Sequence, residues 1–176
     1  MKIKAILISI ILSLLFVIPT PGQDDNAINS KCDCGECDQF DFWIGKWKVQ
    51  WDNSDGTSGE GKNTVNSILN GFLIEENFNG NPGVEFEGKS FSVYNHNENI
   101  WQQTWVDTEG NYMVFTGQME DDKMILSRKI IRDKKELIQR MVFYNISKDE
   151  FDWNWESSKD NSKTWKLNWK LHYSRL

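Results

Sequence analysis

Apolar and polar residues alternate along most of the chain with the period of two that is typical of β-strands. The clearest example lies within residues 41–51, which hold three tryptophans in eleven positions. Trp47, Val49 and Trp51 fall on one side of this segment, while Lys46, Lys48 and Gln50 fall on the other. The alternation predicts a strand with one buried face and one solvent-exposed face.

Similar segments recur, and turn residues separate them about every ten positions, as in an all-β sandwich or barrel. Asn70-Gly71 is the strongest hairpin signal, because a type I′ turn needs positive φ at both central residues. The predicted strands are Trp43–Asp52, Gly59–Leu69, Phe72–Phe78, Glu87–Tyr94, Ile100–Asp107, Tyr112–Met119, Lys123–Ile131, Glu136–Ile146, Phe151–Glu156 and Trp165–Tyr173.

The connections between these strands are short, so a parallel sheet with crossover helices is excluded. No segment carries the apolar stripe of a long amphipathic helix. An open antiparallel sheet of this length would expose two edges and one bare face, and closure removes both problems. The sequence therefore predicts an all-β fold, an up-and-down antiparallel β-barrel of about ten strands.

The N-terminal segment differs from the rest of the chain. Lys2 and Lys4 precede an apolar run over residues 5–18, which Pro19-Thr20-Pro21-Gly22 ends. The run is shorter than a bilayer span, so residues 1–22 are predicted to be a cleaved secretory signal, with an uncleaved anchor as the alternative. Residues 23–39 then form an acidic linker and residues 40–176 the barrel domain. The protein is expected to be secreted or periplasmic, without a membrane span after cleavage.

Three cysteines, Cys32, Cys34 and Cys37, lie close together in the linker. In an exported protein this spacing favours one local disulfide and a spare thiol. Half of a soft-metal site, or free or intermolecular thiols, are the alternatives. All three positions lie outside the predicted barrel, so the fold is not expected to depend on them.

Charge and composition restrict the possible partners. The formal net charge is −6, and the predicted signal contains two lysines and no acidic residue, so the mature chain is more acidic still. An acidic chain is a poor partner for nucleic acids or anionic membranes. The nine tryptophans suit a β-rich domain whose wide side chains fill or line an interior. A monomer or weak dimer is expected.

The stretch Phe42-Trp43-Ile44-Gly45-Lys46-Trp47 resembles the G-x-W opening of the lipocalin and calycin superfamily. That resemblance implies that Trp47 closes one end of the barrel and that an arginine of the last strand packs across it. Arg175 is in phase with Trp169 and Tyr173, which suits this role.

The region from Phe40 to Arg175 is also similar to a bacterial lipocalin-like family of unknown function. The similarity rests on Asp41-Phe42-Trp43-x-Gly45, on Trp101-Gln102-Gln103-Thr104-Trp105-Val106-Asp107 and on the tryptophan-rich C-terminal hairpin. It implies a calycin barrel and no settled activity. Residues 158–165 resemble the Asp-box, a structural turn in which the aspartate, here Asp160, binds turn amides above a tryptophan; Ser162 replaces the usual glycine.

Candidate ligand-binding residues lie on the faces predicted to point inward. Trp101, Gln103 and Trp105 share one face of their strand. A buried Gln103 needs hydrogen-bond partners, which a ligand, a water or Ser90, Ser92 or Tyr94 of the preceding strand would supply. A filled core with satisfied polar pairs is the alternative, because barrels of this size are either filled or hold one small ligand.

Either Glu75 or Glu76 should face the interior, and Glu76 is in phase with Ile74 and Phe78. An interior carboxylate surrounded by tryptophan can anchor a ligand, act as a general acid or base, or pair with Arg128 or Arg140 at the rim. Anchoring or structural pairing is favoured over catalysis.

Cofactor and catalytic signals are weak. The two histidines are His96, in a turn, and His172, whose phase points outward, so neither haem nor zinc is expected. No nucleophile elbow, phosphate loop or dinucleotide fingerprint occurs. The favoured function is binding of a small apolar or aromatic ligand by Trp101, Gln103, Trp105, Tyr94 and Glu76. The alternatives are a β-barrel isomerase or hydrolase with an interior carboxylate, and an interaction module with a solid core.

Overall fold

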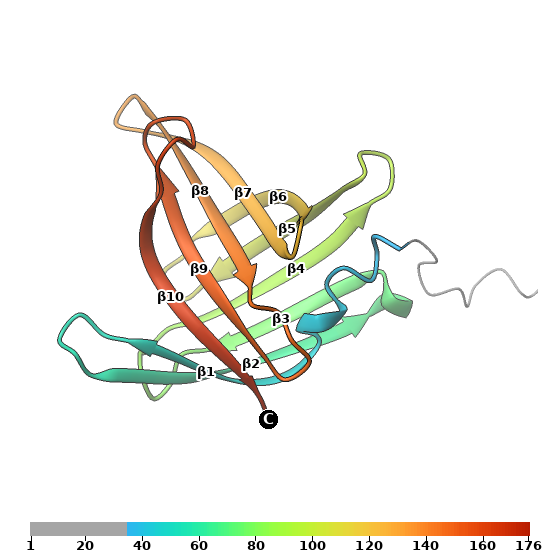
Figure 1. Cartoon of the computed structure of the whole chain (residues 1–176), viewed down its shortest axis with the longest axis horizontal. Coiled ribbons are helices and arrows are strands. Elements are labelled where there is room, and N and C mark those ends of the chain that lie inside the picture. The colour runs from blue at the N-terminus through green and yellow to red at the C-terminus, as the bar shows by residue number, and fades with distance from the viewer. Residues whose placement is uncertain (1–34) are drawn as a thin grey trace, which may run out of the picture.

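The computed structural model describes residues 35–176, which form a closed barrel of ten antiparallel strands (Figure 1). The predicted fold class is therefore confirmed. The predicted signal (1–22) and most of the predicted linker (23–39), with Cys32 and Cys34, lie outside the described residues. The strands are β1 (Gly45–Asp52), β2 (Ser58–Ile68), β3 (Leu73–Asn79), β4 (Glu87–Asn95), β5 (Ile100–Asp107), β6 (Tyr112–Glu120), β7 (Lys123–Arg132), β8 (Lys135–Tyr144), β9 (Glu150–Ser158) and β10 (Lys166–Arg175).

Each strand pairs with the next along the chain, and β1 pairs with β10 to close the barrel. The closing ladder is short, since it runs only from Trp47 opposite Arg175 to Gln50 opposite His172. The β1–β2 ladder, in contrast, extends from Gly45 to Asp52. Closure nevertheless leaves no free edge along the sheet order, which is how barrels avoid edge-to-edge association.

Side chains that alternate along the strands build the interior. In β1, Trp47, Val49 and Trp51 are buried, whereas Lys46 is exposed. In β3 the buried side chains are Ile74, Glu76 and Phe78. Hydrophobic burial on the inner face is the main stabilising term of such a sheet, and it fixes the register, because a slip by one residue would turn each inner side chain outward.

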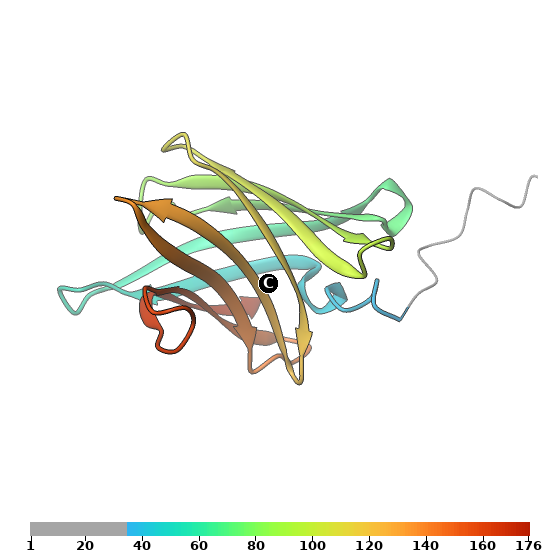
Figure 2. The ribbon, with the colours of Figure 1, turned by 90° about the horizontal axis from the view of Figure 1, so that it is seen from above.

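One end of the barrel is closed by residues that precede β1. The short 3₁₀ helix η2 (Asp41–Trp43) lies at this end of the barrel (blue in Figure 2). Its Trp43 is buried beside Phe40, which is fully buried. Arg175 lies over the Trp47 ring at 4.1 Å, and its Nη1 and Nη2 donate hydrogen bonds to the carbonyl oxygens of Ile44 and Phe42. The Trp47 indole N–H donates to the carbonyl of Trp43 at 2.8 Å.

Successive hairpin turns lie at alternate ends of the barrel. The β4–β5 turn lies at the closed end, where His96 Nε2 is 3.9 Å from Cys37 Sγ. The β1–β2, β3–β4, β5–β6, β7–β8 and β9–β10 connections are at the opposite end. Within residues 35–176, no helix has the length and apolar character needed to cross a bilayer.

Some predicted strand ends were wrong. Trp43 belongs to η2 rather than to the first strand, because the pairing of β1 with β2 begins only at Gly45, opposite Val65. Phe72 lies outside β3 and is 46% exposed. The predicted turn is present within the second 3₁₀ segment η3 (Leu69–Gly71): Asn70 and Gly71 both have positive φ, and the Phe72 amide donates to the Leu69 carbonyl.

Candidate functional site

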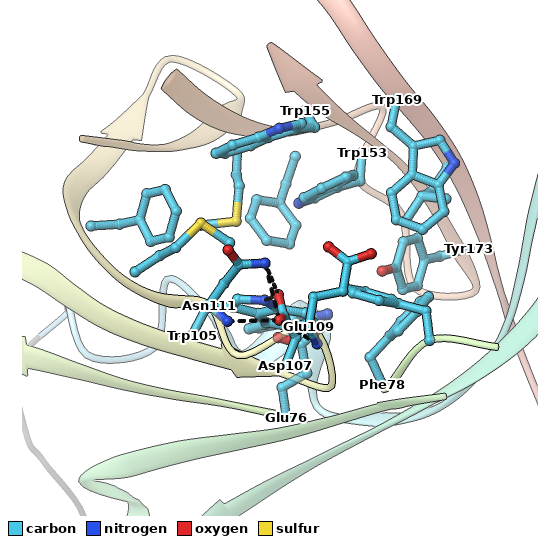
Figure 3. Close-up of a pocket in the computed structure, with 17 residues that line it drawn as sticks. Glu76, Phe78, Trp105, Asp107, Glu109, Asn111, Trp153, Trp155, Trp169 and Tyr173 are labelled. Carbon is cyan, nitrogen blue, oxygen red and sulfur yellow. Dashed lines mark hydrogen bonds between the residues drawn. The ribbon is translucent and has the colours of Figure 1, made fainter. Parts of the chain in front are cut away.

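The barrel contains a cavity of about 220 Å³ (Figure 3), whose lining extends from Trp43 of η2 to Asp107 at the end of β5. Its lining consists of ten aromatic side chains, three other apolar ones, three carboxylates and one amide. These residues are Trp43, Phe78, Phe86, Trp105, Phe115, Phe143, Trp153, Trp155, Trp169 and Tyr173, then Met113, Met141 and Leu171, then Glu76, Asp107 and Glu109, and finally Asn111. The barrel is therefore partly hollow.

Glu76 is the buried carboxyl of this cavity. Its side chain comes from the middle of β3, between Asn63 on β2 and Ser90 on β4. Asn63 Nδ2 donates to Glu76 Oε1 at 2.7 Å, and Ser90 Oγ donates to Oε2 at 2.6 Å. Burial raises the pKa of Glu76 to about 7, because these two hydrogen bonds offset only part of the loss of water. The group therefore exchanges its proton near neutral pH.

Tyr173, on β10, lines the same cavity and is 3% exposed. Burial raises its pKa, the negative charge of Glu76 adds to the effect, and a hydrogen bond with Asn63 opposes it. The phenol is therefore neutral and can donate or accept a hydrogen bond. The cavity thus brings a titrating carboxyl and a neutral phenol into one aromatic environment.

The mouth of the cavity is organised by Asp107 at the end of β5. Trp105 Nε1 donates to Asp107 Oδ2 at 2.8 Å, and the Asn111 side-chain and backbone amides donate to the same carboxylate. Partial burial acts to raise the pKa of Asp107, but the hydrogen bonds from Trp105 and Asn111 lower it below its usual value. The carboxylate is ionised and holds the turn that carries Glu109.

The predicted ligand-binding residues divide into two groups. Glu76 and Trp105 line the cavity. Trp101, Gln103 and Tyr94 lie outside its lining, nearer the closed end. Trp101 packs edge-on against Phe40 and Tyr94. The end of the barrel that holds them is filled by Phe40 and Trp43.

Three buried side-chain atoms have no hydrogen-bond partner among the described residues: Asn63 Oδ1, Gln103 Oε1 and Trp43 Nε1. Gln103 donates from Nε2 to Ser92 Oγ at 2.9 Å, but its Oε1 accepts no hydrogen bond. Trp43 is 2% exposed and lines the cavity, and its indole N–H is also unpaired. Buried polar atoms of this kind are uncommon and are usually satisfied by a water or a ligand.

Sequence reasoning missed most of the aromatic wall. Trp153 and Trp155 on β9 and Trp169 on β10 line the cavity, as do Phe115 and Met113 on β6. The signal was present, because Phe151, Trp153 and Trp155 alternate along one strand. Their inward orientation follows from the complete burial of Phe151 in the same phase.

Neither arginine proposed as a rim partner pairs with Glu76. Arg140 forms an ion pair with Glu156 at 2.7 Å and stacks on Trp165, on the outer side of the sheet. Arg128 faces inward, packs over Phe115 and donates from Nε and Nη2 to Gln139 Oε1. The partners of Glu76 are neutral, and Glu75 is only half-buried.

The β9–β10 turn is held by its own side chains. Asp160 accepts hydrogen bonds from the Thr164 amide and hydroxyl, and Ser158 Oγ donates to it at 2.8 Å. These bonds from Thr164, followed by the bond from Ser158, lower the pKa of Asp160 to about 2. Asn161 and Ser162 both have positive φ. The arrangement is a structural turn without an open site.

The remaining sulfur and imidazole groups lie outside the cavity. Cys37 is disulfide-bonded, and the two other cysteines lie outside the described residues. His172 points outward from β10, and its Nδ1 is 3.0 Å from Asp152 Oδ1. Among residues 35–176, no group of three or more His, Cys, Asp or Glu side chains is arranged to hold a metal ion.

No family model and no curated protein matches the chain. Among solved structures, the barrel is similar to a redesigned β-barrel, with a TM-score of 0.41 and 14% identity. The match covers 82% of this chain and 97% of that one.

Proposed function

We propose that this protein is an exported, lipocalin-like carrier that binds a small apolar or aromatic molecule inside the barrel. The observation that carries the proposal is the open cavity of about 220 Å³ lined by ten aromatic side chains. An apolar cavity of about 150 Å³ is large enough to bind benzene, so this one suits a ligand of one or two rings. The polar groups that would orient it are Glu76 and Tyr173.

The unpaired indole N–H of Trp43 also supports this function. A ligand that carries a hydroxyl or carbonyl group can satisfy such a donor, and the surrounding rings bury the rest of the molecule. The filled end beneath the cavity would be supported by Trp101, Gln103 and Tyr94, which would therefore contribute to ligand binding only indirectly.

A pair of neighbouring residues on β6 offers a matched test. Met113 lines the cavity, whereas Val114 is 51% exposed on the outer face. Tryptophan fluorescence is followed while a panel of small aromatics, fatty acids and porphyrins is added. Met113→Trp should fill the cavity and abolish the response, and Val114→Trp should preserve it. If no compound alters the fluorescence of the wild type, or if Met113→Trp binds equally well, the carrier function is wrong.

An enzyme remains the second candidate, because Glu76, Tyr173 and Asp107 line one open cavity. A carboxyl with a pKa of about 7 can both accept and return a proton at neutral pH. An isomerase of this kind should exchange a ligand's acidic C–H hydrogen with deuterium from the solvent. Glu76→Gln should stop the exchange without preventing binding; exchange that persists in this variant would exclude the role. The third alternative, an interaction module, assumes a solid core, whereas this barrel contains a cavity.

A further inference from the structure

The charged side chains that line the cavity all carry the same sign. Glu76, Asp107 and Glu109 are acidic, and the lining includes no lysine, arginine or histidine. Asp107 and Glu109 lie together at the mouth, opposite the wall formed by Trp153, Trp155 and Trp169 (Figure 3). An acidic mouth attracts cations and repels anions before any contact is made.

Within residues 35–176, Glu76 has no counter-ion. It is 6% exposed, and its hydrogen-bond donors, Asn63 on β2 and Ser90 on β4, are both neutral. From β10 the facing group is Tyr173, a neutral phenol. Ionising a buried carboxyl that has no positive partner costs free energy, and this cost raises its pKa. Each oxygen of the carboxylate still has capacity for another hydrogen bond.

The aromatic walls complete the environment that a cation needs. Tryptophan, tyrosine and phenylalanine rings attract an organic cation through their negative faces, and the attraction is largest away from water. Nine of the ten lining rings belong to Trp or Phe, which cannot accept a proton or compete as bases. The cavity thus combines a buried acceptor of positive charge with rings that surround it.

We infer that the ligand of this cavity is an organic ammonium ion of the arylalkylamine class, with its nitrogen bound at Glu76 and its apolar part against the aromatic wall. The inference rests on the proposed carrier function and specifies its ligand. Asp107 and Glu109 would draw the cation toward the mouth, and Glu76 would supply the contact that discriminates it from neutral molecules.

Basic residues on neighbouring elements do not enter the lining. Arg128 faces inward from β7, but it packs over Phe115 and is held by Gln139. Lys134 lies in the β7–β8 turn and Lys163 in the β9–β10 connection, and both are exposed at the open end. Arg128 is therefore the basic group that an anionic ligand would have to reach, and the ligand would first have to pass the negative charges of Asp107 and Glu109.

Three ligands with one hydrocarbon frame test the charge preference. Dissociation constants of 2-phenylethylammonium, 2-phenylethanol and 3-phenylpropanoate are measured by calorimetry at about pH 8, where Glu76 is mostly ionised. The ammonium ion should bind about tenfold more tightly than the alcohol, and the carboxylate should bind most weakly.

Two variants locate the positive charge. Glu76→Gln keeps the shape of the side chain but removes its charge and replaces one acceptor oxygen with an NH2 donor, which can bond to Ser90 Oγ. The ammonium ion should therefore lose its advantage over the alcohol. Glu109→Gln, at the exposed mouth, should alter the preference by less than about twofold, because exposed charges are screened. Glu120→Gln, at the exposed end of β6 near the closed end of the barrel, is the matched control and should change nothing.

The outcomes separate this inference from the carrier function. If the alcohol or the carboxylate binds as tightly as the ammonium ion, the ligand class is wrong and the carrier function stands. If Glu76→Gln retains the preference, or Glu109→Gln removes it, the nitrogen is not bound at Glu76. If none of the three binds and the wider panel also fails, the carrier function falls and this inference with it.

Discussion

Arg175 and Trp47 face each other across the closing ladder, with the guanidinium carbon 4.1 Å from the centre of the indole ring. The same guanidinium donates to the carbonyls of Phe42, Ile44 and Lys148. One side chain therefore connects the last strand, the segment before the first strand and the β8–β9 turn.

Replacement of Arg175 by lysine should destabilise the barrel by about 2–3 kcal/mol, because an ammonium group cannot stack on Trp47 and serve three carbonyls in fixed directions. Urea unfolding followed by tryptophan fluorescence measures the change. Lys166→Met, at the exposed start of β10, is the control and should leave the midpoint unaltered. Equal midpoints for Arg175→Lys and the wild type would contradict a role in closure.

Stability should fall as the pH rises from about 4.5 to about 7 because of Glu76. Its pKa is raised on folding from 4.5 to about 7, so the folded state holds the proton more tightly than the unfolded state. The contribution is fully present below pH 4.5 and is lost by about pH 7, and a shift of this size corresponds to about 3 kcal/mol.

Glu76→Gln removes the titrating carboxyl and its pH-dependent contribution to stability. The difference in unfolding free energy between variant and wild type should therefore change between about pH 4.5 and pH 7. The comparison isolates Glu76, because the lowered pKa values of Asp107, Asp152 and Asp160 act in the opposite direction and at lower pH. A difference that stays constant between pH 4.5 and 8 would show that Glu76 titrates normally.

Trp105 and Trp101 should respond differently to a bound ligand. Trp105 lines the cavity, whereas Trp101 packs beneath it against Phe40 and donates from its indole nitrogen to Gln39. Trp105→Phe should reduce ligand-induced quenching and weaken binding severalfold. Trp101→Phe, a substitution of the same chemistry on the same strand, should leave the quenching intact. The opposite result would place the ligand at the closed end.

Gly88 should tolerate no larger residue, because an added Cβ would lie 2.1 Å from the Trp105 ring. Gly88→Ala must displace that ring and with it the hydrogen bond to Asp107. We expect a loss of about 1–3 kcal/mol and a shifted emission spectrum, since overpacking costs this much in a well-packed interior. Gly35→Ala, where an added Cβ meets nothing within 4 Å, should be neutral.

The alternation of apolar and polar residues, together with the turn residues, predicted the antiparallel barrel, because each hairpin is specified by its own residues. Strict alternation identified β1, and positive φ at Asn70 and Gly71 was expected from their residue types. The phase of β3 likewise pointed Glu76 inward. These features depend on neighbours in sequence, or on the next strand, which short turns place alongside.

The division of the interior into filled and hollow parts could not be predicted in this way. It depends on Phe40 and Trp43, which precede the first strand and belong to no alternating segment. Trp101 and Trp105 have the same phase and chemistry, yet only Trp105 lies beyond the space that Phe40 and Trp43 occupy. The neutral environment of Glu76 was equally hidden, because Asn63 and Ser90 reach it from two different strands.

The short ladder between β1 and β10 has a consequence for synthesis of the chain. Trp47 is made early, whereas Arg175 and the rest of β10, which cover it, follow more than a hundred residues later. Until then the sheet is an open ribbon with two unpaired edges and uncovered tryptophans, a state prone to aggregation. The barrel therefore cannot close until β10 has been made, and a chain that lacks β10 cannot take the native form.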